Sequence, residues 1–371
     1  MTPVRIAYII NSLEGGGAAL PVPAVIRVMR EAGAEVKLFA LSRRNGRAAA
    51  ALEAAGIVYE VCDAGKSDHL RASLWLWRQL KAYRPTLLWT SLTQATVIGQ
   101  LLGAMMRVPV VSWQHNAFLK PANRALLAVT RRLTRLWVAD SESVAELTRT
   151  RLGIDPARII VWPLFHADPD APVAKACGPD EIFRFGSLGR LHPNKGYDIL
   201  VQALGRLAAD APELSQRFQV LIGGEGAEHD RLTALARDLG VTNLTLAGYQ
   251  SDPRQFLAGV HAYLQPSRAE GLCIAAHEAM QAGLPTVVST VGEMQYSVED
   301  RKTGLVVPPG DVEALAGAIR SLAEDPARAH AMGLAARQHI LTRFSVSRFN
   351  AAGRLIMDQV AGWRQSGERS A

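Results

Sequence analysis

The chain has 371 residues, of which 49% are hydrophobic and 20% charged, and its formal net charge is +7. This composition excludes a disordered protein, and the length predicts two domains rather than one hydrophobic core. Three cysteines (Cys62, Cys177 and Cys273) make no disulfide framework, and no apolar run reaches the ~18 residues that span a membrane, so we expect a cytoplasmic protein in a reducing compartment.

The first half of the chain alternates short apolar runs with helical stretches. Short buried strands joined by helical connections predict a parallel sheet with right-handed crossovers. Strands are predicted at residues 4–10, 35–41, 57–61, 86–91, 109–112, 136–139 and 158–162, and helices at 23–32, 70–82, 95–106, 123–135 and 141–151.

A glycine-rich turn, Gly15-Gly16-Gly17, follows the first predicted strand. Such a loop before a helix can cradle a phosphate. It is not the dinucleotide fingerprint Gly-x-Gly-x-x-Gly, because Leu20 stands where the third glycine would be, and this argues against a dehydrogenase.

Polar residues end two later strands of this half. His115 and Asn116 follow the strand at 109–112, at the edge where a binding cleft is expected. A single histidine in this position is more often structural than catalytic. Ser141 begins the helix at 141–151, where helix capping is the first interpretation and contact with an acceptor the second.

The predicted helix at residues 123–135 is basic and amphipathic. Such a helix can lie on an anionic membrane, and an ordinary solvated helix face is the alternative. The surplus of positive charge lies in residues 1–180, which suits an anionic surface or acceptor, although an alkaline protein without such a partner explains it too. The chain offers no aromatic-rich stacking platform, so we expect no nucleic-acid partner. The arginines and apolar residues alternate as Arg124, Leu126, Leu127, Val129, Arg131, Arg132, Leu133, Arg135 and Leu136.

A polar stretch rich in proline and alanine, residues 166–180, interrupts this pattern and is predicted to link two domains. The alternation then restarts and ends with two long helices, at 326–342 and 346–363. Strands are predicted at 183–188, 218–222, 244–248, 261–265, 286–289 and 304–307, and earlier helices at 196–209, 228–239, 253–258, 275–282 and 312–323.

Two loops of the second half carry cations and glycines. Gly189-Arg190 and Lys195 follow the first strand, and two cations at the carboxyl end of a strand suit a departing diphosphate. A solvated turn is the ordinary alternative. Gly224 and Gly226 follow the second strand and suit either a loop beside a nucleotide or a tight strand–helix turn.

Glu270 and Glu278 stand in the run from Ser267 to Thr286, where a turn with glycine leads into a helix of small residues and then an apolar strand. Carboxylates accept hydrogen bonds from sugar hydroxyls, and the free N–H groups of a helix N-terminus bind phosphate. Two surface glutamates on an amphipathic helix are the simpler alternative.

This run resembles the paired-glutamate signature of the retaining glycosyltransferases of family 4 (glycosyl transferases group 1). The resemblance is specific from Gly186 to Asp311 and generic in the first half. It implies an α/β protein with the GT-B fold, two Rossmann-like doubly wound domains facing across a cleft. Residues 1–170 would bind the acceptor, residues 181–345 the nucleotide sugar, and the helix of residues 346–371 would cross back to the first domain.

The resemblance also implies roles for individual residues. In the family the first glutamate contacts hydroxyls of the donor sugar and the second contacts the ribose, and these roles fall on Glu270 and Glu278. An arginine and a lysine spaced like Arg190 and Lys195 hold the donor diphosphate, and a histidine placed like His115 approaches the sugar. The remaining implied contacts are Gly16, Gly17, Gly189, Gly224, Gly226, Gly271, Leu272 and Cys273 to the donor, and Asn116 and Ser141 to the acceptor.

Two segments depart from the family pattern and leave the donor sugar open. Residues 162–165 read Trp-Pro-Leu-Phe where many relatives have Asn-Gly-Val, and residues 291–296 replace a Gly-Gly-x-x-Glu loop.

The implied activity is metal-independent, cofactor-free and retaining transfer of a hexose from a UDP- or GDP-linked sugar. The expected acceptor is a lipid-linked or cell-surface glycan of cell-envelope polysaccharide biosynthesis, with peripheral contact at the inner face of the membrane. Two alternatives stay open: a nucleotide-sugar epimerase or phosphorylase on the same fold, and a non-catalytic donor-binding subunit. Incubation with the donor alone separates an epimerase, because it needs no acceptor.

Overall fold

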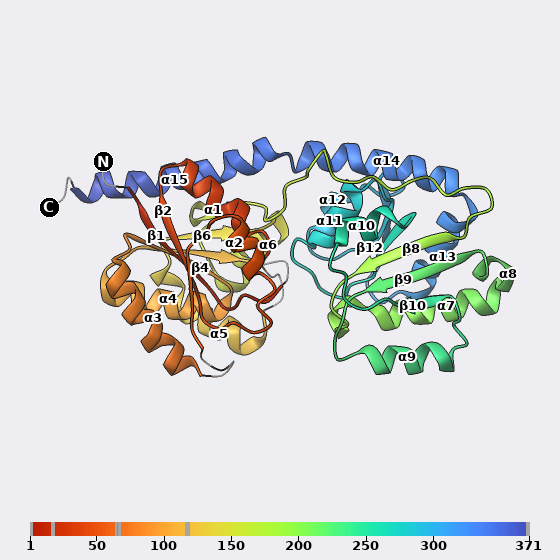
Figure 1. Ribbon diagram of the computed structural model, residues 1–371, viewed down its shortest axis with the longest axis horizontal. Helices are drawn as coiled ribbons and strands as arrows, with labels where there is room; N and C mark the ends of the chain where they lie inside the picture. The colour runs from red at the N-terminus through yellow and green to blue at the C-terminus, as the bar shows by residue number, and fades with distance from the viewer. Residues whose placement is uncertain (1–2, 16–18, 64, 66–67, 116–118, 369–371) are drawn as a thin grey trace. The chain divides into compact units, whose positions relative to one another are not determined.

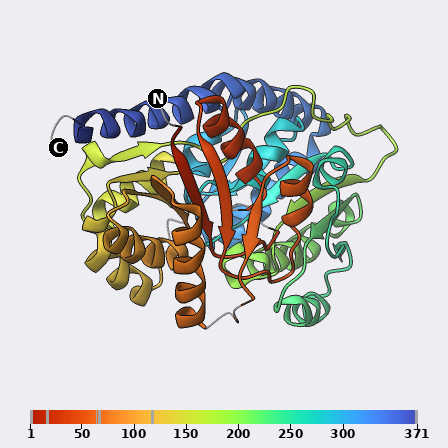
Figure 2. The same cartoon turned by 60° about the vertical axis from the view of Figure 1, so that its left-hand side comes forward.

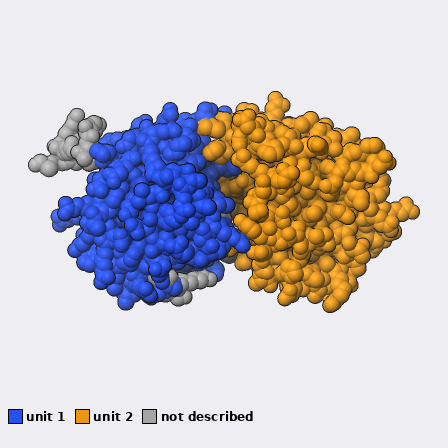
Figure 3. Space-filling view, in the orientation of Figure 1, with its two compact units in different colours: residues 1–165, 347–371 blue, residues 166–346 orange. Residues whose placement is uncertain are grey.

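A computed structural model describes residues 3–15, 19–63, 65, 68–115 and 119–368 of the chain, with side chains to residue 363. Within these residues no helix is both long and apolar enough to cross a membrane. Most of the elements are labelled in Figure 1, and Figure 2 shows the same ribbon after a turn about the vertical axis. The chain divides into two compact units, residues 1–165 with 347–371 and residues 166–346 (Figure 3).

The first unit is built on a seven-stranded parallel sheet in the order β3-β2-β1-β4-β5-β6-β7. Helices pack against both faces of this sheet, with α1 on one side and α3 and α4 on the other (Figure 1). Its strands are β1 (Arg5–Ile10), β2 (Glu35–Ala40), β3 (Tyr59–Val61), β4 (Leu87–Ser91), β5 (Val110–Gln114), β6 (Leu136–Ala139) and β7 (Ile159–Val161). Its helices are α1 (Val22–Glu31), α2 (Ala49–Ala54), α3 (His69–Tyr83), α4 (Thr93–Met106), α5 (Pro121–Thr130), α6 (Glu142–Leu152) and most of α15 (Val346–Glu368), with 3-10 turns at Arg131–Leu133 and Pro156–Arg158.

The central strands of this sheet are buried along their whole length, as expected of a parallel sheet covered on both faces. Every residue of β4 and β5 is buried. Trp113 stacks on Trp162 with ring centroids 5.0 Å apart, and Phe349 of α15 packs on the same Trp162 at 5.4 Å. Aromatic packing therefore holds the start of α15 on the first unit, where Arg27 also donates to Asn350.

The second unit is built on a six-stranded parallel sheet in the order β10-β9-β8-β11-β12-β13. Helices α7 and α9 lie on one side of it and α10 and α11 on the other (Figure 1). Its strands are β8 (Phe183–Leu188), β9 (Phe218–Gly223), β10 (Leu244–Leu246), β11 (Ala262–Gln265), β12 (Thr286–Ser289) and β13 (Gly304–Val307). Its helices are α7 (Tyr197–Asp210), α8 (Pro212–Ser215), α9 (His229–Asp238), α10 (Pro253–Ala258), α11 (Ile274–Gln281), α12 (Met294–Ser297), α13 (Val312–Glu324) and α14 (Pro326–Arg343), with a 3-10 turn at Pro193–Lys195.

The stretch of residues 166–180, which we expected to link the domains, is packed on the second unit. The backbone N–H of Asp168 donates to Gln281 Oε1 at 2.7 Å, and that of Ala174 donates to the carbonyl of Ala282 at 2.8 Å. These bonds attach an otherwise irregular segment to the end of α11, because its backbone groups find partners there.

Each sheet reverses its winding direction at one point. In the second unit β8 is paired with β9 on one side and with β11 on the other, so the loops after β8 and β11 leave towards opposite faces. In the first unit the same relation holds for β1 and β4. Ligands of open parallel sheets bind at the carboxyl ends of the strands beside such a switch point.

Candidate functional site

The loops after β8 and β11 bring Lys195 and Glu270 together at the switch point of the second unit. Lys195 Nζ donates to Glu270 Oε1 at 2.7 Å, with the two side chains 21% and 11% exposed. Burial alone would lower the pKa of the Lys195 ammonium, but the negative charge of Glu270 outweighs it and the pKa is raised. The ammonium therefore stays charged at the mouth of the site.

A second ion pair fixes the loop after β11 to the start of α7. Arg268 Nη1 and Nη2 donate to Asp198 Oδ1 and Oδ2 at 2.6 and 2.7 Å, and the backbone N–H of Arg268 donates to the carbonyl of Asn194 at 2.8 Å. Such a bidentate pair sets geometry as well as energy. Lys195 and Glu270 are thus held in place by contacts outside their own side chains.

Helix α11 begins at Ile274, shortly after Glu270. Its N-cap residue, Cys273, has a left-handed backbone (φ 60°) and makes no side-chain capping bond. The Ala276 N–H donates to the carbonyl of Cys273, whereas the N–H groups of Ile274 and Ala275 have no acceptor among the described residues and can bind an anion. Burial raises the pKa of the Cys273 thiol to about 12, so this thiol is neutral and is no nucleophile. Gly271 and Leu272, the other predicted backbone contacts, are buried in the same turn.

Glu278 lies within α11, and burial raises the pKa of its carboxyl from 4.5 to about 7, with Arg254 opposing the shift. The same helix holds His277, whose Nδ1–H donates to the carbonyl of Cys273 at 2.9 Å and whose Nε2 accepts from Ser297. Burial lowers the pKa of His277 to about 4, so it is a neutral structural residue.

The loops after β8 and β9 lie against each other through their backbones. Gly189 N–H donates to the carbonyl of Gly223, and Leu191 N–H to that of Glu225, both at 3.0 Å. A Cβ on Gly224 would stand 1.9 Å from Gly189 O, and one on Gly226 2.2 Å from Leu191 O. The two backbones therefore approach too closely for a side chain at either position, which explains why both residues are glycines. Arg190, in the same loop, is exposed.

In the first unit, three polar side chains meet at the carboxyl ends of β4, β5 and β6. His115 Nε2 shares a hydrogen bond with Ser91 Oγ at 2.6 Å, and its Nδ1 lies 3.6 Å from Asp140 Oδ2. Burial raises the pKa of the Asp140 carboxyl, against the effect of His115. Both ring nitrogens of His115 thus face groups of its own unit.

Ser141 has the capping role that was the first interpretation of its position. Its Oγ accepts from the backbone N–H of Val144 at 3.2 Å and closes the N-terminus of α6. The other predicted contacts of this unit, Gly16, Gly17 and Asn116, lie outside the described residues.

Cys177, Glu181 and His261 could share a metal ion, since one ligand atom of each lies within 4.8 Å of the others. The backbone N–H of Arg184, however, donates to His261 Nδ1 at 2.9 Å, so the neutral ring carries its proton on Nε2, which faces Glu181 at 3.6 Å. The Arg184 guanidinium also binds Glu181. A metal would have to displace both the proton and this cation, and we assign the cluster no metal.

The chain contains one Asp-x-Asp triplet in residues 166–180, Asp168-Pro169-Asp170. Asp168 Oδ2 accepts from Arg254 at 2.8 Å and its Oδ1 accepts from the backbone N–H of Asp170 at 3.0 Å. Oδ2 thus ties residues 166–180 to Arg254 of α10, and Oδ1 stabilises a turn within that segment.

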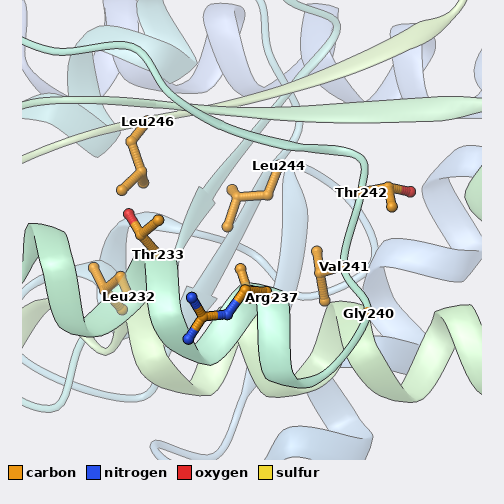
Figure 4. Close-up of a pocket in the computed structure, with 9 residues that line it drawn as sticks. Leu232, Thr233, Arg237, Gly240, Val241, Thr242, Leu244 and Leu246 are labelled. Atoms are coloured by element: carbon orange, nitrogen blue, oxygen red, sulfur yellow. The ribbon is translucent and has the colours of Figure 1, made fainter.

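Two open grooves, each with a volume of about 480 Å³, lie at outer edges of the sheets. The first runs between α9 and the edge strand β10, and its lining includes Leu232 of α9 and Leu244 and Leu246 of β10 (Figure 4). The second lies beside β3 and α3. The first groove offers no carboxylate and neither borders the switch-point strands, so we assign them no catalytic role.

Three residues around Glu270 were missed in the sequence analysis: Tyr263, Gln265 and Ser267. Ser267 Oγ and Gln265 Nε2 donate to Glu270 Oε1 at 2.7 and 3.3 Å. The signal available in the sequence was Gln265, a polar residue at the end of a buried and otherwise apolar strand directly before the glutamate motif.

Two family models match the chain. The model described as Glycosyltransferase Family 4 matches residues 15–165, and the model described as Glycosyl transferases group 1 matches residues 178–339.

Curated relatives match over part of their length. A glycogen synthase of Mycobacterium tuberculosis is 35% identical over 54% of this chain and 45% of its own. A D-inositol 3-phosphate glycosyltransferase of Kribbella flavida is 33% identical over 55% of this chain and 52% of its own. A GDP-mannose-dependent phosphatidylinositol monomannoside mannosyltransferase of Mycolicibacterium smegmatis is 33% identical over 58% and 56%. The matched segments thus span about half the length of these relatives.

Solved structures match over nearly the whole chain. Anabaena HepE in complex with UDP-glucose has a TM-score of 0.82 at 21% identity and covers 96% of this chain and 99% of its own. The sucrose-phosphate synthase of Thermosynechococcus elongatus has a TM-score of 0.76 at 19% identity, over 98% and 100%. At these identities the likeness shows the fold, which confirms the predicted two-domain GT-B architecture.

Proposed function

The chain belongs to the family 4 glycosyltransferases (glycosyl transferases group 1), and we propose that it transfers a hexose-type sugar from a nucleotide diphosphate sugar to an acceptor. The observation that carries this proposal is the pairing of Lys195 with Glu270 beside the uncapped N-terminus of α11. It sets a fixed cation and free backbone donors next to a carboxylate. The first two suit a diphosphate, and the third suits sugar hydroxyls.

In the proposed reaction, the bond between the anomeric carbon and the diphosphate oxygen breaks and the acceptor hydroxyl forms the new bond on the same face of the sugar. Lys195, the exposed Arg190 and the N–H groups of the first turn of α11 stabilise the charge that develops on the leaving diphosphate. The leaving diphosphate accepts the acceptor's proton. The transfer is therefore retaining and uses protein cations in place of a metal.

Glu270 and Glu278 have separate tasks in this proposal. Glu270 accepts hydrogen bonds from the sugar, and Glu278 accepts them from the ribose. His115, from the first unit, approaches the sugar. The donor is UDP- or GDP-linked: the HepE structure contains UDP-glucose, and one relative is named as GDP-mannose-dependent.

The acceptor is proposed to be lipid-linked or part of a cell-surface glycan, reached by peripheral contact with an anionic membrane. The support is a surface of the first unit on the neighbouring helices α4 and α5. Val129 is 82% exposed, Met105 71%, and Leu126 47%. Arg124 and Arg132 are exposed beside them. Exposed apolar groups next to arginines suit an anionic bilayer surface.

Sedimentation with vesicles that contain an anionic lipid tests this contact. We expect the wild-type protein to sediment with anionic but not with neutral vesicles, and Leu126→Glu, which alters a leucine of α5 that is 47% exposed, to reduce binding. Leu334→Glu, which alters an equally accessible leucine of α14 (47% exposed), is the matched control and should bind normally. Equal binding by both variants would refute the surface.

Product analysis tests the reaction itself. The protein is incubated with UDP- and GDP-hexoses, with and without membrane lipid extract, and nucleotide release and the anomeric configuration of the product are followed by NMR. We expect acceptor-dependent release with retention and its loss in Glu270→Ala, with unchanged circular dichroism. Conversion of the donor in the absence of an acceptor would identify an epimerase instead.

A further inference from the structure

The two oxygens of the Glu270 carboxylate have different surroundings. Oε1 accepts three hydrogen bonds, from Lys195 Nζ at 2.7 Å, Ser267 Oγ at 2.7 Å and Gln265 Nε2 at 3.3 Å. No donor among the described residues contacts Oε2. With the side chain 11% exposed, one edge of this carboxylate is saturated by the protein and the other is left to solvent or ligand.

A chain of buried hydrogen bonds fixes this asymmetry. The backbone N–H of Leu188 in β8 donates to Tyr263 OH at 3.1 Å, and this hydroxyl lies 2.8 Å from Gln265 Oε1. Because a carbonyl oxygen only accepts, the Tyr263 hydroxyl is the donor, and the Gln265 amide is oriented with its NH₂ group towards Ser267 and Glu270.

Ser267 is the last residue of this hydrogen-bond network, and the directions of its hydrogen bonds agree with the orientation of the Gln265 amide. Its Oγ accepts from Gln265 Nε2 at 2.8 Å and donates its own proton to Glu270 Oε1. Tyr263, Gln265 and Ser267 are all fully buried. A fully satisfied buried network of this kind permits one orientation of its members.

We infer that Gln265, oriented by Tyr263, is a positioning residue that turns Glu270 so that its Oε2 faces a hydroxyl of the donor sugar. This inference rests on the proposed function of the second unit. The nucleoside diphosphate part of the donor makes no use of Oε2, since it has no hexose hydroxyl. Disturbing Gln265 therefore weakens recognition of the sugar and spares recognition of the diphosphate.

Gln265→Met tests this separation, because methionine keeps the length of the side chain and removes its amide. Tyr263 OH then still has the carbonyl of Leu188 as an acceptor at 3.2 Å, so the variant leaves that hydroxyl satisfied. Gln100→Met is the matched control: Gln100 is also fully buried, lies in the first unit, and donates to Thr134 Oγ1 at 2.7 Å.

Titration calorimetry compares UDP with UDP-glucose and GDP with GDP-mannose on the full chain. We expect Gln265→Met to weaken binding of the nucleotide sugar by about tenfold, as for loss of a hydrogen bond to a charged group. Binding of the matching nucleoside diphosphate should change by less than about twofold, and Gln100→Met should change neither. Tyr263→Phe should reproduce the same selective loss.

The positioning role would be overturned if Gln265→Met weakened binding of the nucleoside diphosphate and of the nucleotide sugar equally, or weakened neither. In both cases the proposed donor site itself would still be supported by wild-type binding. If the wild-type protein binds none of the four probes, the proposed function fails, and the inference fails with it.

Discussion

Replacement of Glu278 by glutamine probes the cost of keeping a partly buried carboxylate in α11. In the folded protein, burial raises the pKa of Glu278 from 4.5 to about 7. An acid with a raised pKa binds its proton more tightly when folded, so the folded state loses stability as the pH rises from 4.5 to about 7. Above that range Glu278 is ionised in both the folded and the unfolded state, and its destabilising contribution to the free energy of unfolding is at its largest.

The size of this effect follows from the difference in pKa, at about 1.4 kcal/mol for each tenfold change in proton affinity. At pH 8 the ionised Glu278 lowers the free energy of unfolding by about 3 kcal/mol, and at pH 5 by about 1 kcal/mol. Glutamine resembles the protonated acid and avoids this cost. Glu278→Gln should therefore be more stable than the wild-type protein at pH 8, and the difference should shrink towards pH 5.

Urea unfolding at the two pH values measures this difference directly. Glu324→Gln, an exposed glutamate at the end of α13, is the control and should change stability by less than about 0.5 kcal/mol at either pH. The stabilised variant should also bind nucleoside diphosphates more weakly, because it lacks the charged acceptor for the ribose. A variant no more stable than wild type at pH 8 would refute the burial of an ionised carboxylate.

Three further substitutions test separate parts of the structure. Lys195→Met should lower the free energy of unfolding, measured in urea, by about 2 kcal/mol. This is less than the loss for a fully buried ion pair, because the Lys195 side chain is 21% exposed. An unchanged free energy of unfolding would contradict the pairing with Glu270. Ser141→Ala should lower the free energy of unfolding by about 1 kcal/mol, because it removes the N-cap of α6. Ser73→Ala is the control and should lower it by less, because the Ser73 hydroxyl only donates to a carbonyl within α3. Equal losses in the two variants would refute the capping role. Gly226→Ala should lower the melting temperature, because its Cβ would stand 2.2 Å from Leu191 O. Gly317→Ala in α13 is the control and should not lower it, because the space at its Cβ position is open. A larger loss in Gly317→Ala than in Gly226→Ala would show that the loops after β8 and β9 are packed differently.

Alternating apolar runs and helices were sufficient to predict most of the secondary structure. The predicted strands at 136–139 and 183–188 coincide with β6 and β8. The helix predicted at 123–135 instead gives way to a 3-10 turn after Thr130, since Thr134 is buried with Ser112 and Gln100. Helices α2, α8 and α12 span six residues or fewer and carry too little periodicity to be predicted.

The candidate site was only partly visible in the sequence. Residue type and position made Lys195 and Glu270 candidates, because a cation and a carboxylate followed two predicted parallel strands, and the resemblance to family 4 implied their roles. The network through Gln265 depends on the pairing of β8 with β11, which brings Leu188 and Tyr263 together over 75 positions of sequence. The high pKa of Glu278 likewise depends on burial by other elements.

Binding of UDP and GDP to the full chain, measured by titration calorimetry, tests the central claim that the second unit holds a donor diphosphate. We expect one of the two to bind, and Arg190→Ala to weaken it by about tenfold or more. Arg206→Ala, which removes an exposed arginine of α7, should bind as the wild-type protein does. Absence of binding by either nucleotide, or unchanged binding in Arg190→Ala, would contradict the account.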